Sequence, residues 1–176
     1  VPERVATEDK PYRPAFTLFP RYHQQRMVRK VADSALQRFI ETGEPGGKYL
    51  IEHSAGSGKT LSICWLAERL HSLHHPETGT KLVDITVILT DRKSLDKNIR
   101  DDLDNFAHLK DVVGYADSAS ELKQFLLQRK SIIVTTQHKF VWILAEIAND
   151  PLLAKRKVAF LIDEAHRSVY QKYRAI

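Results

Sequence analysis

The stretch from 51 to 60, IEHSAGSGKT, has glycines, a lysine and a threonine at the spacing of a nucleotide phosphate-binding loop. In such a loop the glycines let the backbone wrap around phosphates, the lysine reaches the β- and γ-phosphates, and the threonine hydroxyl ligates Mg²⁺. The strict pattern begins with glycine, where this chain has His53, but the remaining residues carry most of the chemistry. The predicted cofactor-binding residues of the loop are Ser54, Ala55, Gly56, Ser57, Gly58, Lys59 and Thr60.

The context of this loop favours phosphate binding over the alternative, a surface turn with a solvated lysine. A glycine-rich loop binds phosphate where it joins a strand to a helix, because free backbone N–H groups and the helix dipole converge there on the anion. The preceding residues, 48–53 (KYLIEH), predict a short buried strand. The apolar residues after the loop recur at helical spacing, at Ile63, Leu66, Ala67 and Leu70.

Two adjacent carboxylates follow the last apolar run, in FLIDEAH at 160–166. Nucleotide hydrolysis needs a carboxylate that holds Mg²⁺ and a base that orients the attacking water. Asp163 directly follows the run, so it is the predicted Mg²⁺ ligand together with Thr60, and Glu164 is the predicted base. A solvated loop is the alternative for the two acids, but the upstream phosphate loop favours a site whose catalytic residues are Lys59, Asp163 and Glu164.

Strands and helices alternate along the chain, which predicts an α/β fold. A helix is expected from Tyr22 to the breakers TGEPGG at 42–47. Further strands are predicted at 84–90, 111–115, 131–137 and 158–166, and further helices at 94–106, 118–128 and 139–149. Helical crossovers between apolar strands indicate a mostly parallel sheet with helices on both faces.

The composition favours a protein with one core and no membrane-spanning helix, but it does not identify the function. The 176 residues suffice for one sizeable core and are short for two. No apolar run approaches the ~20 residues of a membrane helix, and the polar, proline-rich start of the chain is no export signal, so the cytoplasm is the expected location. The lone Cys64 lies among apolar residues and is interpreted as buried. The net charge of +5 is compatible with nucleic acid as a partner.

The phosphate loop and the later Asp-Glu-Ala-His (DEAH box) together resemble the first RecA-like lobe of a superfamily 2 helicase or translocase. FPRYHQ, HSAGSGKT followed by WLA, TDRKSLD, IIVTTQHKF and DEAHRS narrow this resemblance to the motor of the R (HsdR-type) subunit of type I restriction-modification enzymes, over roughly 19–170. The resemblance extends to His53. It implies a RecA-like P-loop NTPase lobe at 21–176 after a linker arm at 1–20, in a fragment that lacks the nuclease domain and the second motor lobe.

The resemblance also suggests roles for individual residues. Gln24 matches the glutamine that reads the adenine edge, which would make ATP the fuel; a polar residue at the helix start is the alternative. Thr90 and Arg92 of TDR, with Thr135 and Thr136 of VTTQ, match segments that contact the DNA backbone. A strand-to-helix cap is the alternative for the first pair. His166 matches a residue that couples nucleotide state to the motor, with a cap or surface histidine as the alternative.

The expected activity is ATP-dependent translocation of double-stranded DNA by the restriction subunit of a bacterial or archaeal type I restriction endonuclease. The implied cofactors are ATP and Mg²⁺. The implied partners are duplex DNA, methyltransferase and specificity subunits, and the second lobe and nuclease domain of the full subunit. Without an arginine from the second lobe, a contribution of ~10³–10⁵ in rate, this chain is expected to hydrolyse ATP poorly. The alternatives are another superfamily 2 DNA or RNA helicase, or a nucleotide-binding lobe without turnover.

Overall fold

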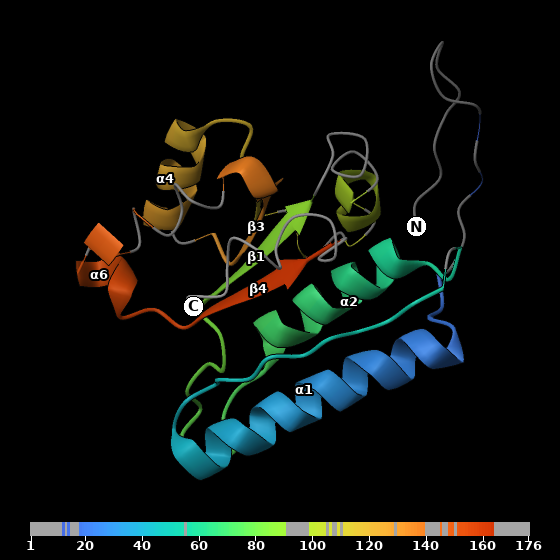
Figure 1. Cartoon of the computed structure of the whole chain (residues 1–176), viewed down its shortest axis with the longest axis horizontal. Helices are drawn as coiled ribbons and strands as arrows, with labels where there is room; N and C mark the ends of the chain where they lie inside the picture. Colours follow the sequence, from blue (N-terminus) through green and yellow to red (C-terminus); the bar gives the residue numbers. More distant parts are fainter. Residues whose placement is uncertain are drawn as a thin grey trace.

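Four parallel strands form the sheet of this α/β fold, in the order β2-β3-β1-β4 (Figure 1). The computed structural model describes residues 12, 14, 18–54, 56–90, 99–104, 106, 109, 111–128, 130–139, 145, 148–149 and 151–163. The strands are β1 (Ile85–Thr90), β2 (Val113–Tyr115), β3 (Ile132–Thr136) and β4 (Val158–Ile162). All four lie within predicted strands, and the parallel pairing confirms the predicted fold class.

Helix α2 covers one face of the sheet, and α1 packs on the outside of α2 (Figure 1). Helix α1 (Tyr22–Thr42) begins where predicted and ends at Gly43, whose φ of 73° and N–H bond to the Phe39 carbonyl at 2.9 Å stop the helix. Helix α2 (Lys59–Ser72) buries Leu66 and Leu70 against α1. The two helices therefore form successive layers beneath the strands.

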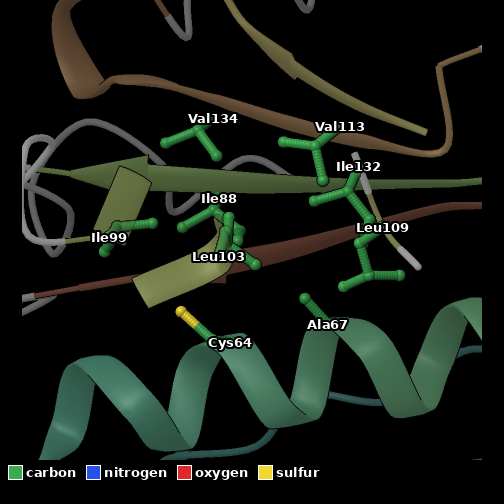
Figure 2. Close-up of a cluster of buried hydrophobic side chains, with 9 residues drawn as sticks. All are labelled: Cys64, Ala67, Ile88, Ile99, Leu103, Leu109, Val113, Ile132 and Val134. Carbon is green, nitrogen blue, oxygen red and sulfur yellow. The ribbon is translucent and has the colours of Figure 1, made fainter. Parts of the chain in front are cut away.

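The core between α2 and the sheet is apolar on both sides. Figure 2 shows Cys64 and Ala67 of α2 directed toward the strands, where Ile88, Ile132 and Val134 lie in the same cluster. Cys64 is fully buried, as predicted, and burial raises the pKa of its thiol.

Helix α4 (Ala119–Leu127) packs on the opposite face of the sheet. It contributes Leu122 and Leu126 to a cluster with Val87 and Leu89 of β1. Because neighbouring residues of a strand point to opposite faces, both sides of β1 are covered, and all six of its residues are buried. This two-sided burial explains the continuous apolar runs from which the strands were predicted.

One predicted strand is wrong. Residues 48–53 form no ladder and run as an extended segment along α1, with the Tyr49 hydroxyl donating to Ser34 Oγ at 3.2 Å (Figure 1). Leu50 is 78% exposed, so the segment is not buried either. Within the described residues β4 is an edge strand that pairs with β1 alone. The sequence pattern identified an extended segment correctly but could not supply its pairing partner.

The remaining helices are described only in part. Residues 99–103 are helical, in agreement with the end of the helix predicted at 94–106. Most of the helix predicted at 139–149 lies outside the described residues. Two short elements were not predicted, the 3-10 helix η2 (Gln137–Lys139) and helix α6 (Pro151–Ala154). No helix in the part of the chain that the structure describes is long and apolar enough to span a membrane.

Candidate nucleotide-binding site

The glycine-rich loop leads directly into α2. Gly56 has φ 72° and Gly58 has φ 82°, left-handed values that favour glycine at both positions. Between them the Ser57 N–H donates to the Ser54 carbonyl at 3.2 Å, which closes a turn. The N-terminus of α2 lies toward the arrowheads of β1 and β4 in Figure 1. The loop therefore sits at the carboxyl end of the strands, the usual binding edge of such sheets.

The start of α2 has the chemistry of an anion site. The first N–H groups of a helix have no acceptor within it, and the N-cap Gly58 supplies no side-chain cap to them. Lys59 and Thr60 are the first two residues of the helix and bring an ammonium and a hydroxyl to the same turn. Ser57 Oγ and His53 Nδ1 are buried without a hydrogen-bond partner among the described residues. These donors and orphaned polar atoms fit a polyphosphate and its Mg²⁺. The predicted loop residue Ala55 lies outside the described residues.

The first turn of α1 holds the loop in place through Gln24. This side chain is 2% exposed, and its Oε1 accepts from the Arg21 N–H at 2.8 Å. Its Nε2 donates to the Gly58 carbonyl at 3.0 Å and to the Ser57 carbonyl at 3.3 Å. In this conformation the amide is bonded to the loop and to the backbone at the start of α1, and the second of these bonds is what the alternative, a polar residue at the helix start, predicts. The adenine contact stays a prediction.

A histidine pair also contacts the loop. His23 Nε2 donates to the Ser57 carbonyl at 3.0 Å, and its ring meets that of His53 edge to face, with the centroids 5.6 Å apart. Burial lowers the pKa of His53, and the charges of His23 and Lys59 lower it further. These surroundings therefore favour the neutral form of His53. The sequence singled out His53 as a departure from the strict pattern that the family resemblance shares, but gave it no chemical role. It gave no role to His23 either, for which adjacency to Gln24 was the available signal.

The predicted Mg²⁺ ligand Asp163 lies at the carboxyl edge of the sheet. It directly follows β4, is 5% exposed, and donates its N–H to the Leu89 carbonyl of β1 at 2.9 Å. Its own carbonyl accepts from Gln137 Nε2 at 2.9 Å. Gln137 thus fixes the backbone at Asp163, a contact between η2 and the end of β4 that the sequence did not reveal. Glu164 and His166 lie outside the described residues.

The residues predicted to contact DNA differ in how far they are buried. Thr90 and Thr135 are fully buried, and their hydroxyls donate to the carbonyls of Thr135 at 3.4 Å and Ala116 at 3.0 Å. In this conformation neither side chain reaches the surface, so both act as strand-end hydrogen-bonding residues. Thr136 is half-buried at the end of β3, and Arg92 lies outside the described residues. For all four residues the DNA contact stays a prediction.

Comparison with known proteins identifies an ATPase family and a group of relatives. Residues 23–176 match the family model of the SWI2/SNF2 ATPase. The chain is 31% identical over 158 residues to the type I restriction enzyme HindI endonuclease subunit of Haemophilus influenzae, covering 85% of this chain and 14% of that protein. It is 30% identical over 172 residues to the putative MjaVIIIP endonuclease subunit of Methanocaldococcus jannaschii, covering 89% and 16%.

In a shorter relative the match covers most of both chains. The C-terminal part of the putative MpnIIP endonuclease subunit of Mycoplasma pneumoniae is 29% identical over 154 residues, covering 84% of this chain and 69% of that protein. No solved structure matches the chain. The chain spans about a seventh of the length of the first two relatives. By the match over most of its length, the chain belongs to the SWI2/SNF2 ATPase family, and its relatives are endonuclease subunits of type I restriction enzymes.

Proposed function

We propose that this chain is the ATP-binding lobe of a motor that translocates double-stranded DNA within the restriction subunit of a type I restriction endonuclease. The observation that carries the proposal is the left-handed glycine loop at the N-terminus of α2, with Lys59 and Thr60 in its first turn. Asp163 supplies a carboxylate at the same edge of the sheet. The matches to an ATPase family and to restriction endonuclease subunits support the same function.

The roles of the residues follow from their chemistry. Lys59 and the N–H groups of the first turn of α2 bind the β- and γ-phosphates of ATP. Thr60 and Asp163 hold Mg²⁺, which neutralises charge on the phosphates when bound. Glu164, next in sequence to Asp163, orients the water that attacks the γ-phosphate. Gln24 and His23 keep the loop in its binding conformation through the Ser57 and Gly58 carbonyls.

The partners of the whole subunit are part of the proposal. The relatives are named as subunits of type I restriction enzymes, which supports a complex with methyltransferase and specificity subunits. A second RecA-like lobe and a nuclease domain belong to the same proposed subunit. Duplex DNA is the expected polymer, with Thr136 and Arg92 as the proposed backbone contacts. The formal charge of +5 is consistent with a polyanion as a partner.

The test is calorimetric titration of Mg-ATP into the chain and into Lys59→Ala. We expect loss of measurable binding in Lys59→Ala, because the ammonium is the only full positive charge that the pattern directs at the phosphates. Lys123→Ala, on α4 at the far face of the sheet, is the control and is expected to bind like the parent. Equal binding by Lys59→Ala, or none by the parent chain, would refute the proposal. Competition between duplex DNA and RNA for the ATP-loaded chain separates a DNA translocase from an RNA helicase.

A further inference from the structure

Two histidines from separate segments meet beside the phosphate loop. His23 is the second residue of α1, and His53 lies just before the loop; their rings pack edge to face at 72°. His23 Nε2 carries a hydrogen, because its partner at 3.0 Å is the Ser57 carbonyl, which can only accept. The pair is therefore tied to the backbone of the loop itself and not only to the surface around it.

His53 has a ring nitrogen that could bind a proton. Its Nδ1 is buried without a hydrogen-bond partner among the described residues. The residue thus has an unused ring nitrogen a few residues from the proposed phosphate site. The titratable side chain of His23 on α1 contacts His53, and Lys59 on α2 acts on it electrostatically. The adjoining groove of about 830 Å³ is lined by three further cationic residues, Arg26, Lys30 and Lys48, and by Glu52.

We propose that His53, supported by His23, is a positioning residue that takes up a proton when a polyphosphate binds to the loop. The proposal rests on the proposed function, that the loop binds the phosphates of ATP. The Lys59 ammonium is close enough to His53 to act on it electrostatically. An anion bound by Lys59 offsets that positive charge and adds a negative one, so the bound state favours the imidazolium. His23 meanwhile keeps its hydrogen bond to Ser57.

The sign of the pH dependence follows from linkage. The pKa of His53 is lowered in this structure. Under the proposal it rises when the anion binds, because a negative charge nearby favours the imidazolium. The bound state therefore holds more protons than the free state between these two pKa values. In that window the affinity for polyphosphate increases as the pH falls, by up to about tenfold per pH unit for one proton. Above the bound-state pKa no proton is taken up and the gain is lost.

Calorimetric titration of Mg-ADP from about pH 5.5 to about pH 8, the range in which histidine titrates, tests the proposal. Repeating it in two buffers of different ionisation enthalpy counts the protons taken up. The parent chain is expected to take up a proton that His53→Asn does not, so the difference removes protons bound by the nucleotide itself. His23→Asn is expected to move the pH profile to higher pH, because His53 loses a neighbour that lowers its pKa. His75→Asn, outside the loop, serves as the control.

A spectroscopic readout is independent of binding energy. The imidazole C–H signals of His53, assigned by their loss in His53→Asn, are expected to titrate at higher pH after Mg-ADP is added. An unchanged His53 titration, or equal proton uptake by the parent and His53→Asn, would overturn the proposal while binding sensitive to Lys59→Ala still stood. Absence of nucleotide binding at every pH would overturn the proposed function, and the proposal with it.

Discussion

Replacement of Gly58 by alanine is expected to destabilise the chain more than the same replacement at Gly43. Both glycines have left-handed φ angles, 82° and 73°, so both variants incur the conformational cost of an L-residue, about 1–2 kcal/mol. They differ in surroundings. A Cβ at Gly43 meets nothing within 4 Å, whereas a Cβ at Gly58 lies 2.5 Å from Gln24 Nε2. Gly43→Ala therefore measures the backbone cost alone.

The excess at Gly58 can be worked out from the contacts of Gln24. The amide has to move away from the new methyl group, and it is buried, with Nε2 donating to both the Gly58 and the Ser57 carbonyls. Each such bond contributes about 0.5–1.5 kcal/mol net, and a buried donor left unpaired costs about 1–3 kcal/mol. Gly58→Ala is therefore expected to exceed Gly43→Ala by about 1–3 kcal/mol in the free energy of unfolding.

Urea denaturation of the two variants measures this difference directly. A double-mutant cycle sharpens it, because Gln24→Ala removes the amide that the methyl group meets. In that background Gly58→Ala is expected to cost only the backbone term. Equal midpoints for Gly58→Ala and Gly43→Ala, or an excess that persists without Gln24, would show that the amide does not brace the loop.

Two further predictions concern the scaffold. Ser118→Ala is expected to lower the free energy of unfolding by about 1 kcal/mol, because Ser118 Oγ caps α4 by accepting from the Glu121 N–H at 3.1 Å. Ser118→Thr keeps the acceptor, and a loss as large as that of alanine would contradict the capping argument. The Cys64 thiol is expected to resist alkylation in the native chain at about pH 8 and to react fully in denaturant, since it is buried and its pKa is raised. Complete labelling of the native chain would show that the core between α2 and the sheet opens readily.

Of the strands that the sequence predicted correctly, β1 is fully buried, β2 and β3 are buried except at their last residue, and the edge strand β4 is half-buried. The run at 84–90 is apolar on both faces because α2 and α4 cover β1 from opposite sides. Residues 48–53 also contain a short apolar run, at 49–51, but residues 48–52 are exposed along α1. Strand propensity records only that a segment suits an extended conformation. Whether it joins a ladder depends on a partner far away in the chain, and local pattern carries no information on that.

In the site too, local features could be predicted from the sequence, whereas contacts between distant residues could not. The phosphate loop was predictable because its glycines, lysine and threonine are contiguous and their spacing alone determines the chemistry. The contacts of His23 and Gln24 with Ser57 and Gly58 join residues 33 and 34 positions apart, so they depend on how α1 packs against α2. The burial of Thr90 likewise follows from the pairing of β1 with β3, which places its hydroxyl on a neighbouring carbonyl.

Gln24 has two proposed contacts, the phosphate loop and the adenine base. The two N–H groups of its amide cannot serve both contacts at once. Its two N–H groups are already directed at the Ser57 and Gly58 carbonyls, and its oxygen accepts from Arg21. A bidentate pairing with adenine needs one N–H and the oxygen. Adenine recognition by Gln24, which stays a prediction, would therefore require release of at least one bond to the loop, whereas the oxygen, with two lone pairs, can keep the Arg21 bond. The structure described here is thus the state in which Gln24 braces the loop. If Gln24 also reads adenine, it does so in a second state in which one of these loop bonds is released.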